Sequence, residues 1–207
     1  MIPKILHHIW IGDESQRPQE NIESWQRMHP DWKHIVWGNN HLLNTPWINR
    51  KHMTNDLPLC GVADLMRYEI LWSLGGVYVD ADSTCLRPLP DWLLECEAFA
   101  SWEHEIMRPG LLSNGFLGFG EHNPLMRRVI KDLEAKPTVT DDEPWKVTGP
   151  LRLTKSWVAL AYLNLTILPS HFFAPNHFTE ASYSGGGPVY ATHHWGTTLN
   201  SYRRPSL

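Results

Sequence analysis

The stretch from residue 74 to residue 82, LGGVYVDAD, constrains the fold more than any other part of this sequence. Its two glycines end an apolar helical pattern, and three residues that favour strands follow them. Asp80 and Asp82 come where that strand should end. Side chains at positions i and i+2 of an extended segment point the same way, so these two carboxylates are expected to share one ion. In α/β sheets the carboxyl edge of such a strand is where ligands bind.

Two clustered carboxylates at the end of a buried strand favour a hard divalent cation. Mg²⁺ and Mn²⁺ prefer oxygen ligands and usually also bind phosphate oxygens and water. A single Asp-x-Asp sequence is more often a solvated turn, and here the helix and strand before it favour the metal. The pattern therefore predicts a metal and phosphate site at this edge of the sheet.

Composition limits the classes of protein that this chain can belong to. Its 207 residues suffice for one domain with a sizeable core, and 42% hydrophobic with 19% charged residues indicates a globular chain. A net charge of −4 gives no indication of nucleic acid or an anionic membrane as a partner. The three cysteines are scattered, without CxxC spacing, which favours a reducing compartment. We find no apolar run of the roughly 18 residues that a membrane span requires.

Hydrophobic periodicity predicts alternating strands and helices in the N-terminal half. We expect strands over residues 5–11 and 32–37, with a helix over residues 20–29 between them. The strongest helix covers residues 57–74, with a proline in its first turn and a glycine at its end. Asp64, Arg67 and Tyr68 are spaced so that they lie on one side of that helix.

The C-terminal half continues the same alternation. Strands are expected over residues 97–102, 115–119, 165–168 and 189–192, and helices over residues 122–135 and 148–162. Residues 136–146 and the glycine-rich residues 182–188 are expected to be loops. The last strand leads into His193-His194-Trp195. Because we find neither a repeat nor a linker, we interpret residues 1–207 as a single α/β domain.

Four blocks of this sequence resemble, in this order, a known family: IPKILHHIWIG, ADLMRYEIL, GGVYVDAD and HHW. They resemble the sugar-transferase family that carries a DXD motif, which includes yeast-type initiating mannosyltransferases, capsular polysaccharide glycosyltransferases and viral relatives. The glucosylating clostridial toxins are similar more distantly. The resemblance implies a GT-A type domain, the nucleotide-diphospho-sugar transferase fold, with a mixed, mostly parallel central sheet flanked by helices. It also implies a nucleotide-sugar donor, a divalent ion (usually Mn²⁺, with Mg²⁺ as the alternative) and retention of anomeric configuration.

The resemblance assigns roles to residues around the DXD motif. Asp80 and Asp82 would hold the metal and the donor's ribose or diphosphate, with Ala81 between them in the donor site. His193 or His194 would supply a further metal or phosphate contact. A neutral imidazole is an acceptable ligand for Mn²⁺, although a strand-end histidine is often simply hydrogen-bonded to backbone.

Other donor-site residues are implied by the same resemblance. Asp64 and Arg67 match the pair that binds donor sugar hydroxyls, and Tyr68 lies beside them. Trp10, next to Ile11, matches the position that packs on the nucleotide base. Asn114 falls where relatives place an amide or acid beneath the anomeric carbon, which makes it a catalytic candidate together with Asp82. The alternatives are a surface ion pair, a core tryptophan and a buried strand-end amide.

The late motif departs from the family. Relatives often continue it into a Ser-Trp pair near the phosphates, whereas this chain reads GTTLNSY over residues 196–202. Either Thr197 or Thr198 substitutes, or closure over the donor differs. Related Golgi enzymes carry an N-terminal membrane anchor that this sequence lacks, so we expect a soluble, cytoplasmic protein of a bacterium or a virus-infected cell. The chain could also be a domain cut from a larger enzyme.

The primary hypothesis is a metal-dependent retaining glycosyltransferase that moves a hexosyl or deoxyhexosyl group to a glycan or other hydroxyl acceptor. A UDP-sugar is favoured over a GDP-sugar. One alternative is a metal-dependent phosphoester hydrolase, which would need further ligands for a second ion. Another is a non-catalytic sugar-binding module, which the intact Asp-x-Asp argues against. The sequence identifies neither the sugar, the acceptor nor the oligomeric state.

Overall fold

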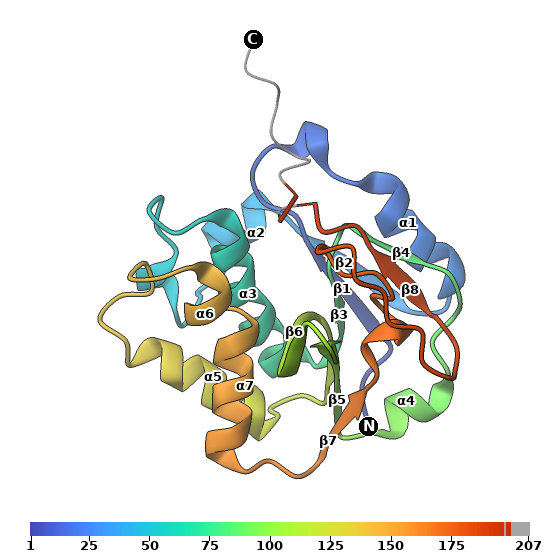
Figure 1. Cartoon of the computed structure of the whole chain (residues 1–207). Coiled ribbons are helices and arrows are strands. Elements are labelled where there is room, and N and C mark those ends of the chain that lie inside the picture. Colours follow the sequence, from blue (N-terminus) through green and yellow to red (C-terminus); the bar gives the residue numbers. More distant parts are fainter. Residues whose placement is uncertain (197, 200–207) are drawn as a thin grey trace.

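The computed structural model describes residues 1–196 and 198–199 and has a central sheet covered on both faces (Figure 1). Six strands form this sheet in the order β2–β1–β3–β6–β5–β7. Their bounds are Lys33–Trp37, Ile5–Ile9, Gly76–Val79, Arg108–Phe119, Ala98–His104 and Leu165–Leu168. The pairs β1–β2, β1–β3 and β5–β7 are parallel, and β6 runs antiparallel to both its neighbours. The expected mixed, mostly parallel sheet is confirmed.

Helices and a small second sheet cover the two faces. The helices are α1 Gln19–Met28, α2 Asn39–Asn44, α3 Leu59–Leu74, α4 Asp91–Glu95, α5 Pro124–Glu134, α6 Pro144–Val147 and α7 Pro150–Leu160. Short 3-10 helices cover Glu14–Gln16, Arg50–His52 and Ser170–Phe172. The second sheet pairs β4, Ser83–Cys85, with β8, Ala191–His193. Helices α3, α5 and α7 lie on one side of the central sheet, and α1, α4 and the second sheet on the other (Figure 1).

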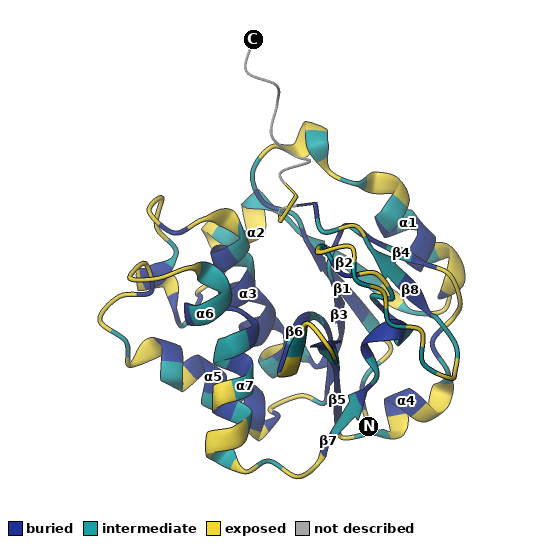
Figure 2. Ribbon diagram, in the orientation of Figure 1, coloured by how far each residue is buried: buried dark blue, intermediate teal, exposed yellow. Residues whose placement is uncertain are grey.

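The alternation of β3 divides its side chains between two hydrophobic clusters. Tyr78 belongs to the cluster on the α3 side, whereas Val77 and Val79 belong to the cluster that contains Trp25 of α1. All four strand residues are buried, and Figure 2 shows the buried centre of the sheet between half-exposed helices. This burial on both faces explains the uninterrupted apolar run that precedes the acids.

The glycine pair is a steric requirement of this arrangement. Gly76 has a φ of 99°, and a Cβ there would lie 2.6 Å from the backbone oxygen of Ile5. A side chain would therefore be strained and would also push β1 away from β3. The Gly-Gly stop thus ends α3 and permits close pairing of the two central strands.

Two parts of the sheet differ from the expectation. Strand β6 begins at Arg108 rather than at residue 115, because Pro109 and Gly110 in its first half give a turn-like sequence. It forms a hairpin with β5 whose register shifts on both sides of Trp102. Strand β4 was not predicted, because three residues carry too little periodicity to recognise.

The end of the loop expected over residues 136–146 instead belongs to the short helix α6, Pro144–Val147. Among the described residues, every helix is too short or too polar to cross a bilayer.

Candidate functional site

The two aspartates converge through a turn. Strand β3 ends at Val79, and the Ser83 N–H donates to the Asp80 carbonyl oxygen at 3.1 Å, which closes a turn over Asp80–Ser83. The Ser83 hydroxyl donates to the same oxygen at 2.6 Å. We expected an extended segment to direct the two carboxylates the same way, and this backbone conformation is wrong. The turn nevertheless brings the two carboxylates to the same site. Ala81, between them, is buried.

His193 completes a cluster with the two carboxylates. Its Nε2 lies 3.1 Å from Asp82 Oδ1 and 3.5 Å from Asp80 Oδ2. One ligand atom from each of the three residues lies within 4.8 Å of the other two. The antiparallel pair β4–β8 sets this geometry because it places Ser83 opposite His193. Two carboxylates and one imidazole are a donor set that suits Mn²⁺, with room for phosphate oxygens.

The structure separates the two candidate histidines. The His194 ring is directed at Thr84, with 2.8 Å between Nε2 and Oγ1, and the residue is exposed. Its backbone N–H donates to the Asp82 carbonyl oxygen at 3.1 Å. Neighbouring residues of a strand point to opposite faces, so only one of them could join the cluster. The prediction of His194 as a metal ligand is therefore corrected: its ring lies away from the cluster, and its backbone N–H binds the Asp82 carbonyl oxygen.

Electrostatics keep the Asp82 carboxylate charged. Burial favours the neutral acid, but the charge and hydrogen bond of His193 and the Gly196 N–H outweigh it and lower the pKa of Asp82 to about 2. The Gly196 N–H donates to Asp82 Oδ2 at 2.7 Å. Burial also opposes protonation of His193, yet the carboxylates of Asp82 and Asp80 raise its pKa above the usual value. A cation at this site would replace that proton.

Arg67 connects helix α3 to the cluster. Its guanidinium lies 3.2 Å from Asp64 Oδ1 and 3.3 Å from Asp80 Oδ1, and it donates to the Asn114 carbonyl oxygen at 2.5 Å. It also lies 4.4 Å from the centre of the Tyr78 ring. The side chain is 6% exposed, so the alternative of a surface ion pair is excluded. The neighbouring carboxylates and Tyr78 outweigh burial and raise the Arg67 pKa further.

Asn114 and Asp64 form a second layer of fixed polar groups beside Arg67. Asn114 Nδ2 donates to Asp64 Oδ1 at 2.7 Å and to the Tyr68 hydroxyl oxygen at 3.2 Å. The Thr148 hydroxyl donates to Asp64 Oδ2 at 2.9 Å. Burial raises the pKa of Asp64 to about 6, against the lowering effects of Arg67 and Thr148. The structure thus brings Asp64, Arg67, Tyr68 and Asn114 together with Asp80, although their contacts with a donor remain predictions.

Three residues of the site were missed by sequence reasoning. Tyr78 donates its hydroxyl hydrogen bond to Asp80 Oδ1 at 2.7 Å. Its position two residues before Asp80 could have indicated this, since both side chains leave the same side of the chain. The sequence indicated Thr148 only as the start of a helix. Gly115 read only as the start of a strand, yet a Cβ there would lie 2.4 Å from Asp80 Oδ2.

Gly115→Ala should weaken binding of Mn²⁺ with little loss of folding. The added methyl group would displace the Asp80 carboxylate, because real Cβ atoms do not approach an oxygen that closely. We expect the dissociation constant for Mn²⁺, measured by calorimetry in the presence of UDP, to rise about tenfold or more. Gly186→Ala is the matched control, since nothing lies within 4 Å of a Cβ at Gly186. Equal metal affinity in the two variants would contradict the placement of Asp80.

The remaining candidates lie at or behind this edge. Trp10 and Ile11 follow β1, which is parallel to β3, and Trp10 Nε1 donates to the Asp13 carbonyl oxygen at 3.0 Å. Their role at the base stays a prediction. Glu69, which follows Tyr68 on α3, accepts the backbone N–H groups of residues 48 and 49 at 2.6 and 2.8 Å. Thr197 lies outside the described residues, and Thr198 is exposed.

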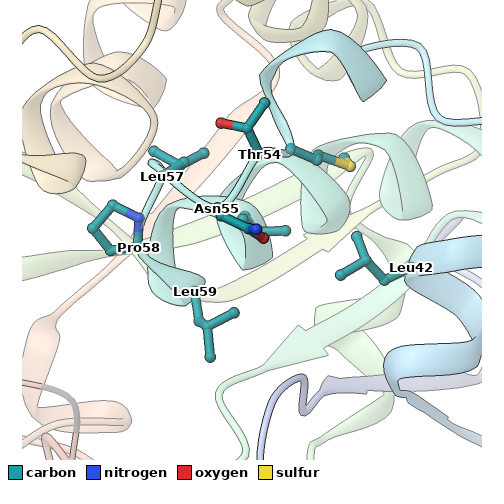
Figure 3. Close-up of a pocket in the computed structure, with 8 residues that line it drawn as sticks. Leu42, Thr54, Asn55, Leu57, Pro58 and Leu59 are labelled. Carbon is teal, nitrogen blue, oxygen red and sulfur yellow. The ribbon is translucent and has the colours of Figure 1, made fainter.

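An apolar pocket of about 260 Å³ opens near the start of α3 (Figure 3). It is lined by Leu42, Met53, Thr54, Asn55, Leu57, Pro58, Leu59 and Val62, none of which was a predicted donor residue. Leu59 is also the side chain that a Cβ at Gly12 would meet, at 2.7 Å. The pocket therefore lies on the side of the molecule where the chain leaves β1 after Trp10 and Ile11.

Comparisons with known proteins bear on this site. Residues 15–99 match the family described as "Glycosyltransferase sugar-binding region containing DXD motif". Inositol phosphoceramide mannosyltransferase 3 of Schizosaccharomyces pombe is 27% identical over 94% of this chain and 60% of its own length. Mannosyl phosphorylinositol ceramide synthase CSH1 of Saccharomyces cerevisiae is 31% identical over 76% of this chain and 43% of its own. The chain thus spans about half the length of these curated relatives.

Solved structures support the fold. A glycosyltransferase involved in glycosylation of the major capsid of PBCV-1 has a TM-score of 0.56, with 8% identity and 95% coverage of both chains. The PaToxG glycosyltransferase has a TM-score of 0.56, with 14% identity, covering 77% of this chain and 70% of its own. The resemblance to DXD-containing sugar transferases is confirmed: residues 15–99 match that family's model, and the chain has the GT-A fold of these glycosyltransferases.

Proposed function

We propose that this chain is a metal-dependent, retaining glycosyltransferase that moves a hexosyl or deoxyhexosyl group from a nucleotide-diphosphate sugar to a hydroxyl acceptor. The observation that carries the proposal is the convergence of Asp80, Asp82 and His193, with the buried Arg67 lying 3.3 Å from Asp80. This arrangement joins a cation site to the polar face of α3. The match to the DXD sugar-binding region supports the same assignment.

The residues of the site divide the work of the reaction. Asp80, Asp82 and His193 would hold the cation, which supplies Lewis-acid stabilisation to the departing diphosphate. Arg67 is fixed by two carboxylates and adds a permanent positive charge beside them. Asp64 and Asn114 hold carboxylate and amide oxygens in fixed positions as acceptors for the hydroxyl groups of the donor sugar, because Asn114 Nδ2 already donates to Asp64 and Tyr68.

Retention fits transfer from the front face of the donor. In that reaction the departing phosphate oxygen takes the proton of the acceptor hydroxyl, and the acceptor oxygen forms the new bond to the anomeric carbon. The protein then supplies position and charge instead of a covalent nucleophile. Asn114 is an amide held by Asp64 and Tyr68, which suits a positioning role beneath the anomeric carbon.

The donor proposed first is a UDP-sugar, with a GDP-sugar as the second candidate. A toxin glycosyltransferase domain of similar fold, with a TM-score of 0.52, was solved with UDP bound. Curated relatives are named mannosyltransferases, which supports mannose among the sugars to test. The same names concern inositol phosphoceramide, so inositol-bearing acceptors belong in the test beside glycans.

The phosphoester hydrolase is less well supported. Within residues 1–196 and 198–199, a single group of three potential ligands gathers, which suits one ion. Two-metal hydrolysis needs ligands for a second ion about 4 Å away. The sugar-binding module is also less well supported, because the intact pair Asp80 and Asp82 gathers with His193 into a group that suits a cation at a departing diphosphate.

Donor hydrolysis in the absence of acceptor tests the proposal. We expect the protein, incubated with UDP- and GDP-sugars, to release nucleotide from one donor with Mn²⁺ and to release none with EDTA. Nucleotide release would be followed by chromatography, with UDP–Mn²⁺ binding measured separately by calorimetry. Release that is insensitive to EDTA would contradict the metal dependence. Absence of both release and UDP–Mn²⁺ binding would contradict the function itself.

A further inference from the structure

A second polar cluster lies beside the cation site and is built from different elements. Glu103 on β5, Arg108 on β6 and His177 in the segment before β8 form it, and we call these three residues the hairpin cluster. Glu103 Oε1 lies 3.3 Å from Arg108 Nε and 3.8 Å from His177 Nε2. The register shifts of the β5–β6 hairpin on either side of Trp102 fall next to Glu103. Such irregularities commonly re-aim a side chain towards a site.

The hairpin cluster contains a buried donor without a partner. His177 is 3% exposed, and its Nε2 has no hydrogen-bond partner among the described residues. Nδ1 accepts from the Thr179 N–H at 3.4 Å and lies 2.8 Å from the Thr179 hydroxyl oxygen, whose hydrogen can also point to it, so we assign the hydrogen to Nε2. Burial, together with His104 and Arg108, lowers the pKa of His177 to about 4, which keeps the ring neutral. The 3.8 Å from Nε2 to Glu103 Oε1 is too long for a hydrogen bond.

The hairpin cluster is connected to the cation site by aromatic contacts. The Trp195 ring centre lies 5.2 Å from the His177 ring and 4.3 Å from the His193 ring. The proposed donor-side residues come from α3, from the end of β3 and, with Asn114, from β6. The hairpin cluster is therefore linked to the cation site through Trp195.

Aromatic side chains flank the charged end of the hairpin cluster. The Arg108 guanidinium lies 4.4 Å from the centre of the Trp145 ring and 5.6 Å from that of Phe178. Its side chain is 27% exposed, so this end of the hairpin cluster is open to solvent. A carboxylate, a neutral imidazole donor and aromatic walls are groups that suit a ring carrying hydroxyls.

We propose that the hairpin cluster is the acceptor subsite, where Glu103 and His177 together bind one hydroxyl group of a polyol ring, a sugar or a cyclitol. This inference rests on the proposed transferase function. A hydroxyl group both donates and accepts, so it can donate to Glu103 Oε1 and accept from His177 Nε2–H. It would thereby satisfy the buried donor that the protein leaves unpaired, because the 3.8 Å between Nε2 and Glu103 Oε1 is too long for a direct hydrogen bond.

The test uses Mn²⁺ bound at the cation site as a local probe. In the complex of protein, Mn²⁺ and UDP, we would measure the paramagnetic relaxation of the protons of myo-inositol and methyl α-mannopyranoside by NMR. The wild-type complex should enhance relaxation of at least one of these polyols. Glu103→Gln and His177→Gln should each raise the polyol dissociation constant about tenfold, the effect of one lost charge-assisted or buried hydrogen bond. The affinity for UDP and Mn²⁺ should not change.

Several outcomes overturn the inference. If the wild-type complex enhances the relaxation of neither polyol, polyol binding at the hairpin cluster is excluded. It is also excluded if Glu103→Gln leaves the enhancement unchanged. Equal weakening of UDP–Mn²⁺ and polyol binding would show that Glu103 only holds the hairpin in place. Glu95→Gln, at an exposed position on α4, is the control for the loss of a carboxylate. Donor hydrolysis would be measured on the same samples. Hydrolysis without polyol binding would contradict the acceptor subsite alone, whereas loss of both would contradict the transferase function.

Discussion

Asp82→Asn should abolish Mn²⁺-dependent nucleotide release from the donor while leaving the fold intact. The carboxylate is ionised, with a pKa held near 2, and lies 3.1 Å from the only described imidazole of the cation cluster. An amide keeps the shape and can still accept from the Gly196 N–H, but it removes the charge that a cation needs. Because bound metal supplies several kcal/mol to the transition state, we expect the rate to fall about a thousandfold.

The control for this variant is Asp91→Asn. Asp91 pairs with Lys4 at 3.3 Å on the surface, with its side chain 87% exposed, so its loss should change neither rate nor metal binding. Circular dichroism would establish that both variants fold. Wild-type turnover by folded Asp82→Asn would contradict the assignment of the cation site. Loss of turnover with full Mn²⁺ affinity would place Asp82 on the substrate instead of the metal.

Local sequence patterns predicted the helix and the strand that position this site. The apolar helix, the Gly-Gly stop and the strand before Asp80 each depend on residues within one segment. Their order in the chain was therefore sufficient to place α3 and β3. The DXD match begins before these elements and extends through them. The sequence also placed Asp64 and Arg67 on one side of that helix, although their burial was not predicted.

What sequence reasoning could not predict depends on contacts between distant segments. The choice of His193 over His194 is made by the register of β8 against β4, two strands of three residues each. Gly115 approaches Asp80 because β6 pairs with β3, and Thr148 reaches Asp64 across 84 residues. The hairpin cluster depends on a shift in register that has no sequence signal. Short strands, bulges and long-range pairs therefore account for most of what was missed.

Arg67→Ala should destabilise the protein and weaken binding of both UDP and the UDP-sugar in the presence of Mn²⁺. A pair that only touched sugar hydroxyls would spare UDP. Here, however, the guanidinium lies 3.2 Å from Asp64 and 3.3 Å from Asp80, and it is almost fully buried. Its removal leaves two carboxylates uncompensated, which typically costs about 3–5 kcal/mol of folding free energy. Urea denaturation would measure that loss, and calorimetry would measure nucleotide and metal binding.

Arg67→Lys separates charge from geometry in this prediction. Lysine keeps the positive charge but cannot bridge Asp64, Asp80 and the Asn114 carbonyl oxygen at once, because it lacks the planar fork of arginine. We expect it to recover most of the folding free energy and less of the UDP-sugar affinity. If Arg67→Ala unfolds no more easily than wild type, the buried carboxylates are not held by this guanidinium. If Arg67→Lys restores UDP-sugar binding in full, charge alone explains the role of Arg67.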